Sequence, residues 1–258
     1  MDFSRFDVRK YPVRSVREGY GEWAASYEDI VQDVMDVRLL ERIQSVDWKS
    51  IQAGADLACG TGRTGAWLKQ HGVGALDGVD LTAEMLEGAR AKAIYRDLVV
   101  GDMRETPLPT GAYDLVTVSL ADEHLPDLRP LYQEAARLAR PGGYFVLVGY
   151  HPYFVMLNGM PTHYKNPSGE SIAIETYIHL TSDHVRAALA ADWSLREMHE
   201  GLIDEEYLAH KPKWSKYRDH PISFAMVWQK ENKEHLPKPS SPNGNDGSRP
   251  ASRPEGRG

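Results

Sequence analysis

The stretch ADLACGTGRTG, residues 55–65, decides the fold. It contains the spacing Gly60-x-Gly62-x-x-Gly65, which is typical of a nucleotide-binding turn between a strand and a helix. Any ligand that approaches the backbone closely at such a turn selects the same glycines, so the spacing alone also allows an NAD(P)-dependent oxidoreductase. The residues around the loop must decide which ligand it holds.

Strand-like and helix-like segments alternate around this loop, which predicts a mostly parallel sheet covered on both faces. The expected strands are 53–58, 74–80, 96–102, 113–120, 144–150, 193–201 and 222–229. The expected helices are 63–72, 83–93, 128–140 and 181–191. No clear helical pattern separates the last two strands, so they can pair antiparallel. The predicted fold class is α/β, with a doubly wound, seven-stranded, mostly parallel, Rossmann-like sheet that has a C-terminal antiparallel strand.

The chain of 258 residues fits one elaborated domain. We expect an N-terminal extension over 1–15, a main domain over 16–230 and a tail over 231–258. The tail is rich in Pro, Gly, Ser and charge, which predicts disorder. Within the main domain, the connection 151–180 is long enough to predict a functional insertion such as a substrate lid.

The composition argues against several classes of protein. A net charge of −7 does not suit a broad basic surface for nucleic acid. No apolar run approaches the roughly 18 residues of a membrane span, and the first residues lack a signal-peptide pattern. The single cysteine, Cys59, excludes an internal disulfide, and no histidine spacing predicts a metal site. We therefore expect a cytoplasmic monomer or homodimer that acts on a small molecule, without metal, membrane or nucleic acid.

Carboxylates stand at three successive strand ends, Asp56, Asp80 and Asp102. In open α/β sheets the ligand binds at the carboxyl ends of the strands. Asp80 lies twenty residues after Gly60 and can accept hydrogen bonds from a ribose diol in a dinucleotide or an adenosyl ligand. Asp56 discriminates between them, because an acidic side chain before the loop repels a pyrophosphate and attracts a cationic ligand.

The segments DLACGTGRTG, GVDLTAEML, GDMRETPLP, YDLVTVSLADEHLPDL and LARPGGYFVLV follow one another in a defined order. In order and spacing they resemble class I S-adenosylmethionine-dependent methyltransferases with a type 11 domain, particularly the small-molecule branch that includes quinone-biosynthesis C-methyltransferases. The resemblance covers about residues 18–230. It implies a seven-stranded fold, S-adenosyl-L-methionine as the cofactor, and transfer of a methyl group to a small, partly apolar molecule at O, C or N.

By position, the resemblance also implies which residues bind the cofactor. The methionine part lies against Asp56, Ala58, Gly60 and Gly62. The ribose diol lies on Asp80 beside Leu81, and the adenine lies between Met85, Asp102 and Met103, with Leu120 as a further contact. Ala58 stands where many relatives have glycine, and Gly65 becomes a helix-packing residue.

The resemblance also implies that the loop after the fourth strand faces the reactive methyl group. Here Asp122, Glu123 and His124 are candidates to contact the acceptor or take its proton, and His124 is the first choice because imidazole titrates near neutrality. Packing is the alternative role for His124. His151, at the end of the fifth strand, is a second catalytic candidate.

Two further segments are candidates to shape the acceptor pocket. Tyr20, Trp23 and Tyr27 share one face of an N-terminal helix, as either pocket or core. The insertion contributes the candidate substrate-binding residues Tyr153, Tyr177 and His179. The basic segment KPKWSKYR, 211–218, is either a solvated loop or a site that attracts an anionic acceptor. The alternatives to a methyltransferase are an NAD(P)-dependent oxidoreductase and a non-catalytic protein that binds an adenosyl cofactor.

Overall fold

The computed structural model describes residues 1–30 and 35–231. Its main sheet has seven strands in the order β4-β3-β2-β5-β6-β10-β9. Their bounds are β2 (Ala53–Leu57), β3 (Ala75–Asp80), β4 (Asp97–Val100), β5 (Tyr113–Ser119), β6 (Ala139–Tyr150), β9 (Trp193–Leu202) and β10 (Pro221–Lys230). Only β10 runs against its neighbours in this sheet, since it pairs antiparallel with both β6 and β9. The predicted seven-stranded, mostly parallel sheet with an antiparallel C-terminal strand is confirmed.

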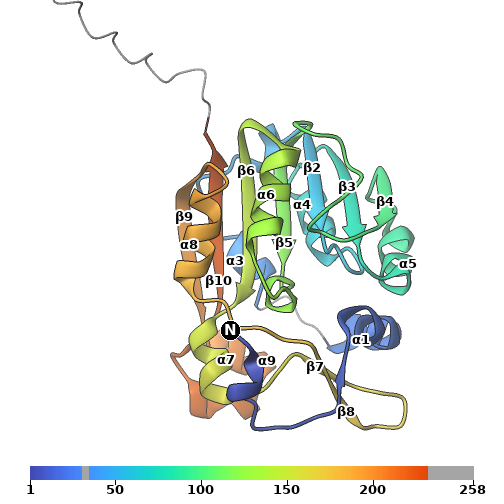
Figure 1. The fold of residues 1–258 in the computed structure, drawn as a ribbon, viewed down its shortest axis with the longest axis vertical. Helices are drawn as coiled ribbons and strands as arrows, with labels where there is room; N and C mark the ends of the chain where they lie inside the picture. The colour runs from blue at the N-terminus through green and yellow to red at the C-terminus, as the bar shows by residue number, and fades with distance from the viewer. Residues whose placement is uncertain (31–34, 232–258) are drawn as a thin grey trace, which may run out of the picture.

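Helices cover both faces of this sheet (Figure 1). The helices of the described part are α1 (Val16–Trp23), α2 (Tyr27–Ile30), α3 (Val37–Leu40), α4 (Arg63–Gln70), α5 (Ala83–Lys92), α6 (Arg129–Leu138), α7 (Pro152–Asn158), α8 (Thr181–Leu189) and α9 (Glu205–His210). Short 3-10 turns, η1 to η5, are Phe3–Arg5, Ala24–Ser26, Trp48–Ser50, Asp122–His124 and Pro212–Tyr217. In Figure 1, α6 and α8 lie in front of the sheet and α3 and α4 behind it.

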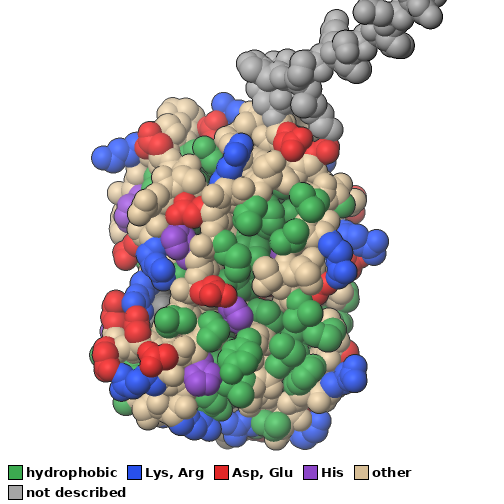
Figure 2. All heavy atoms as spheres, turned by 90° about the vertical axis from the view of Figure 1, so that its left-hand side faces the viewer, with side chains coloured by type: hydrophobic (Ala, Val, Ile, Leu, Met, Phe, Trp, Pro, Cys, Tyr) green, Lys and Arg blue, Asp and Glu red, His purple; other side chains and the backbone are tan. Residues whose placement is uncertain are grey.

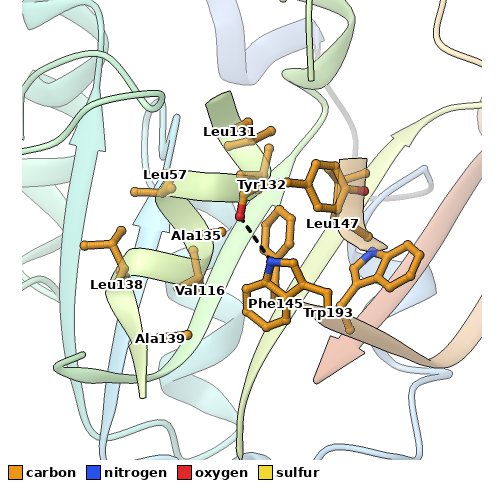
Figure 3. Close-up of a cluster of buried hydrophobic side chains, with 14 of the residues drawn as sticks. Leu57, Val116, Leu131, Tyr132, Ala135, Leu138, Ala139, Phe145, Leu147 and Trp193 are labelled. Carbon is orange, nitrogen blue, oxygen red and sulfur yellow. Dashed lines mark hydrogen bonds between the residues drawn. The ribbon is translucent and has the colours of Figure 1, made fainter. Parts of the chain in front are cut away.

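The sequence of β6 explains why two cores form. Side chains of a strand alternate between the faces of its sheet. Phe145 and Leu147 accordingly join the core under α6 and α8, whereas Val146 and Val148 join the core under α3 and α4. In the first core Trp193 donates a hydrogen bond from Nε1 to the carbonyl oxygen of Tyr132, at 3.1 Å (Figure 3). Two buried faces therefore fix the sheet as the central layer.

A second, three-stranded sheet joins the N-terminus to the insertion. It has the order β1-β8-β7, formed by β1 (Val13–Arg14), β7 (His163–Lys165) and β8 (Ser171–Ile174). β1 runs parallel to β8, with Val13 opposite Ala173. The connection 151–180 thus contains α7 and a β-hairpin, and Figure 1 shows these elements with α1 at one end of the main sheet.

The face that carries α7, α8 and β9 is rich in apolar side chains. Figure 2 shows them gathered over the middle and lower parts of this face. Exposed apolar residues on these elements are Leu157, Leu189, Leu195 and Leu202. Among the described residues no helix has the length and apolarity to cross a membrane. Apart from Glu231, the predicted tail lies outside the described residues.

Candidate active site

A cavity of about 390 Å³, here called the loop cavity, lies at the carboxyl ends of the parallel strands. The residues after β2, β3, β4 and β5 form its floor, and α1 and the insertion form its other walls. Its lining includes most of the residues predicted to bind a cofactor: Ala58, Gly60, Asp80, Leu81, Met85, Asp102, Met103 and Leu120. The sequence motifs therefore meet at one edge of the sheet.

The backbone of this floor is held in a conformation that L side chains rarely adopt. Ala58 and Leu120 follow β2 and β5, and both have φ of 51°. Gly60 has φ of 54°, and a Cβ atom there would lie 3.2 Å from Cε of Met85. Left-handed conformations cost a non-glycine residue about 1–2 kcal/mol. Such strain is concentrated at ligand sites, where surrounding structure enforces it.

Asp80 ties the walls of the loop cavity together. Its Oδ2 accepts a hydrogen bond from the Gly60 amide at 2.8 Å, and its Oδ1 accepts one from the Thr82 amide at 2.9 Å. Burial raises the pKa of Asp80, and the hydrogen bonds from Thr82 and Gly60 oppose this rise. Because each carboxylate oxygen has two lone pairs, Asp80 can still accept hydrogen bonds from a diol in the cavity.

Asp56 lies beneath the floor instead of in the cavity. Its Oδ2 accepts a hydrogen bond from the Tyr95 hydroxyl at 2.6 Å, and its Oδ1 accepts one from the Thr117 hydroxyl at 2.8 Å. Burial raises the pKa of Asp56 to about 6, although both hydrogen bonds lower it. The same tyrosine explains Gly65, because a Cβ atom there would lie 2.1 Å from the Tyr95 hydroxyl.

The far end of the cavity is apolar with one ion pair. Met85 and Met103 line it beside Asp102, whose carboxylate binds the guanidinium of Arg104 at 2.6 Å. The Arg104 hydrogen bonds lower the pKa of Asp102. Gly62 is outside the cavity, where it caps α4 with φ of 85°. Gly62 therefore contributes to the site by forming the turn that leads into α4.

The N-terminal aromatic residues share one helix face, as predicted, and form a wall between two cavities. Trp23 stacks on Tyr20 with ring centroids 5.7 Å apart, and it meets Tyr27 at 5.0 Å. Tyr20 and Tyr27 line the loop cavity, whereas Trp23 lines a second one.

This second cavity, of about 430 Å³, is here called the lysine cavity. It lies between the insertion and the segment that connects β9 to β10. Its walls are largely apolar and include Phe154, Trp214, Tyr217 and Ile222. The same lining contains the basic residues Arg9, Lys211, Lys213 and Lys216. The basic segment 211–218 is therefore part of a cavity wall.

His124 stands at the boundary between the two cavities. Its Nδ1 is 2.6 Å from the carbonyl oxygen of Glu175, which can only accept, so Nδ1 carries the proton. In the neutral ring Nε2 then accepts a hydrogen bond from the Tyr20 hydroxyl at 2.9 Å. His124 lines the loop cavity, with both ring nitrogens occupied. It can take a proton from that cavity only through Tyr20.

Glu123 is the carboxylate that lines the lysine cavity. Its side chain is 6% exposed, and Oε2 has no hydrogen-bond partner among the described residues. The other oxygen, Oε1, accepts a hydrogen bond from the Thr162 hydroxyl at 3.2 Å and lies 3.6 Å from Nε2 of His124. Sequence reasoning ranked this residue below its neighbour His124. The preceding Asp122 is buried against His184 and lines neither cavity.

Three of the predicted catalytic and substrate-binding residues lie outside both cavities. His151 binds the Glu200 carboxylate through Nε2, at 3.0 Å. Tyr153 is 45% exposed and stacks on His220, and His179 is buried with Nε2 2.7 Å from the carbonyl oxygen of Leu125. Each of them therefore has a packing or surface role in this structure. Tyr177, from the same insertion, does line the loop cavity.

A buried ion pair under the site was missed from the sequence. The Arg63 guanidinium binds Oδ1 of Asp36 at 2.9 Å, and the Asp36 side chain is 2% exposed. Ser119, at the end of β5, donates to the other oxygen of Asp36 at 3.3 Å. The sequence held one weak signal of this pair: Arg63 begins α4, where the helix dipole disfavours a cation and an acidic partner offsets that cost.

The described residues offer neither a metal site nor a reactive cysteine. No group of three or more His, Cys, Asp or Glu side chains in residues 1–30 and 35–231 is arranged to hold a metal ion. Cys59 is buried, and burial raises the pKa of its thiol well above the ordinary value. A thiol in that state is a poor nucleophile.

Comparisons with known proteins agree with this geometry. Residues 55–147 match the family model of a methyltransferase domain. Over 138 residues the chain is 35% identical to the ubiquinone/menaquinone biosynthesis C-methyltransferase of Roseobacter denitrificans, covering 49% of this chain and 55% of that protein. Over 102 residues it is 36% identical to the demethylmenaquinone methyltransferase of Thermus thermophilus, covering 38% and 46%. The chain thus spans about half the length of these curated relatives.

The fold is also found among solved structures. The crystal structure of an S-adenosylmethionine-dependent methyltransferase from Mesorhizobium loti matches with a TM-score of 0.59 and 19% identity, covering 75% of this chain and 96% of that one. At this identity the match shows the fold alone. Together with the family model and the curated relatives, it confirms the resemblance noted in the sequence. Over residues 55–147 the chain carries the sequence of a methyltransferase domain, and its fold is similar to that of a solved S-adenosylmethionine-dependent methyltransferase.

Proposed function

We propose that this protein transfers a methyl group from S-adenosylmethionine to a small, partly apolar molecule. The loop cavity holds the cofactor and the lysine cavity holds the acceptor. One observation carries this proposal: adjacent residues line the two cavities, with Glu123 in one and His124 in the other. Methyl transfer requires the acceptor atom to reach the sulfonium methyl group in line, so the two molecules must meet at the boundary between the cavities, beside Glu123 and His124.

The loop cavity fits an adenosyl amino acid by its chemistry. Asp80 offers free lone pairs to a ribose diol, and Met85 and Met103 offer apolar contact to a purine. The left-handed turns at Ala58 and Gly60 bring the backbone to the cavity surface without a side chain between. When bound, the cofactor supplies an electrophilic methyl group on a sulfonium. Asp56 lies beneath this site and affects it by holding the loop after β2 in position.

Two residues can remove a proton from an acceptor hydroxyl, amine or carbon acid. Glu123 lines the lysine cavity, and one of its carboxylate oxygens has no hydrogen-bond partner among the described residues. His124 reaches the loop cavity only through the Tyr20 hydroxyl. We therefore assign direct contact with the acceptor to Glu123, and to His124 the role of holding Tyr20 and the Glu175 backbone in place.

The variant Glu123→Gln tests this assignment, because it keeps the shape and one oxygen but removes the basic carboxylate. We expect turnover to fall by about 10²–10⁴-fold while the affinity for S-adenosylhomocysteine is unchanged. In His124→Gln an amide replaces the imidazole. Activity close to that of the wild type in this variant would agree with a positioning role for His124. Full turnover in Glu123→Gln would contradict the assignment.

The proposal itself is tested by calorimetric titration with S-adenosylhomocysteine and with NAD. We expect heat from S-adenosylhomocysteine only. Tight binding of NAD alone would instead support an NAD(P)-dependent oxidoreductase. Transfer of a radiolabelled methyl group to molecules of a metabolite extract then separates an enzyme from a protein that only binds the cofactor. Binding without transfer to any fraction would contradict methyl transfer.

A further inference from the structure

Four basic side chains line the lysine cavity, Arg9, Lys211, Lys213 and Lys216. None of them forms an ion pair with a carboxylate of residues 1–30 or 35–231. Lys216 has a different contact, with its ammonium 4.6 Å from the centre of the Tyr217 ring. The chain as a whole carries a net charge of −7, so the positive charge of this cavity wall is opposite in sign to the net charge of the protein.

The positive charges of these residues influence the same groups in the cavity wall. Burial lowers the pKa of His163, another residue of the cavity wall, and the charges of Arg9 and Lys213 lower it further. Burial and the charge of Lys213 also lower the pKa of Lys211. Arg9 comes from the N-terminal segment and the lysines from the β9–β10 connection, so distant parts of the sequence bring like charges together. Such a cluster favours an anion between its members.

Two residues of the cavity lining also carry a buried polar atom that has no hydrogen-bond partner among the described residues. Nε1 of Trp23 is a donor, and Oε2 of Glu123 is an acceptor. Trp23 is 6% and Glu123 is 5% exposed. Buried polar atoms are rarely left unpaired in folded proteins, so a ligand that pairs with them is favoured. With the apolar walls between, the cavity offers hydrogen bonds, apolar contact and positive charge to one molecule.

We propose that the methyl acceptor is an anionic small molecule, whose carboxylate or phosphate group binds Arg9, Lys211 and Lys213 while another polar group binds Glu123. This inference rests on the proposed function and adds the charge of the substrate. Glu123, the acidic residue of this lining, repels an anion, so the anionic group lies on the basic wall and the group that bears the methyl lies on the Glu123 side.

The first experiment identifies the charge of the acceptor. A metabolite extract passed through an ultrafilter is separated on a strong anion exchanger at pH 8, and each fraction is incubated with the protein and S-adenosylmethionine carrying a radiolabelled methyl group. We expect label transfer in the retained fraction. Transfer in the unretained fraction alone would overturn the inference and leave methyl transfer standing, whereas no transfer in any fraction would contradict the proposed function.

Treating the active fraction with alkaline phosphatase distinguishes the two anions. Loss of acceptor activity identifies a phosphate, and retained activity identifies a carboxylate. Either result agrees with the proposal.

The second experiment tests the basic wall with the active fraction as substrate. In Lys213→Glu we expect the acceptor concentration for half-maximal rate to rise at least about tenfold, the equivalent of about 1.4 kcal/mol. Lys213→Arg should retain most activity. The matched control is Lys49→Glu, which changes the net charge equally but lies before the amino end of β2 and lines neither cavity.

The affinity for S-adenosylhomocysteine and the thermal midpoint should be unchanged in all three variants. If Lys213→Glu and Lys49→Glu raise the half-maximal concentration equally, the effect is one of net charge and the assigned wall is wrong.

Discussion

The buried carboxylate of Asp56 makes the stability of this protein depend on pH in a defined direction. Burial raises its pKa from 3.8 to about 6 in the folded chain. A tenfold change in an equilibrium constant is worth about 1.4 kcal/mol, so keeping this carboxylate ionised in the folded state costs about 3 kcal/mol at neutral pH. Asp56→Asn removes that cost and retains groups that can bond to the hydroxyls of Tyr95 and Thr117.

The sign follows from the two pKa values. An unfolded chain ionises Asp56 around 3.8, whereas the folded chain holds the proton until about 6. Between these values the unfolded state loses the proton first, so its stability relative to the folded state increases as the pH rises. The contribution of Asp56 to stability is therefore full below 3.8, falls through the window up to about 6, and is constant above it.

Urea unfolding of the wild type and of Asp56→Asn from pH 4 to pH 7.5 measures this contribution. Subtracting the two free energies of unfolding removes the pH dependence of every other group. We expect the difference, wild type minus variant, to fall by about 2–3 kcal/mol across the series. A difference that stays constant, or that rises with pH, would refute a raised pKa. A constant offset would report only the exchanged hydrogen bonds.

Three further changes follow from the site. Ala58→Gly relieves the left-handed strain and should raise the thermal midpoint of unfolding by about 2–4 °C. The control Ala66→Gly, inside helix α4, should lower the midpoint. Equal effects of the two substitutions would contradict strain at Ala58. Asp80→Asn should weaken S-adenosylhomocysteine binding about 10–100-fold in calorimetry, and an unchanged affinity would exclude Asp80 as a ligand. Arg63→Met removes the guanidinium that binds the buried Asp36 carboxylate, and it should lower the free energy of unfolding in urea by about 3–5 kcal/mol. A loss of less than about 1 kcal/mol would show that the ion pair is dispensable.

The main sheet and the loop cavity were predictable because their signals are local. Strands with alternating or continuous apolar residues, and a glycine turn after the first strand, determine the layers and place Asp80 and Asp102 at one edge. Asp56 was placed in the right strand, but its hydrogen bonds with Tyr95 and Thr117 were not predicted. Which face a side chain at a strand end meets depends on partners such as Tyr95, which comes from a distant segment.

The second sheet and the lysine cavity were not predictable. β1 has two residues and β7 has three, too few for any periodicity. The pairing of Val13 with Ala173 is set by packing between distant segments, which a single sequence does not display. For the same reason His124 looked more reactive than Glu123: imidazole chemistry is visible in the sequence, whereas the occupied nitrogens and the unpartnered carboxylate oxygen are visible only in three dimensions.

The pairing of β1 with β8 also sets an order of events during synthesis. Residues 13 and 14 are synthesised before residues 173 and 174, but they cannot form their strand until those residues have followed them. The residues of the loop-cavity floor end at Pro126, and Leu120 among them is held by a hydrogen bond to Val148 in β6, while the wall at Tyr177 comes later. A nascent chain that ends at β6 therefore has the floor of the loop cavity without its cover. Contacts between such distant residues form late and slowly, so the loop cavity is enclosed only after its floor has been synthesised.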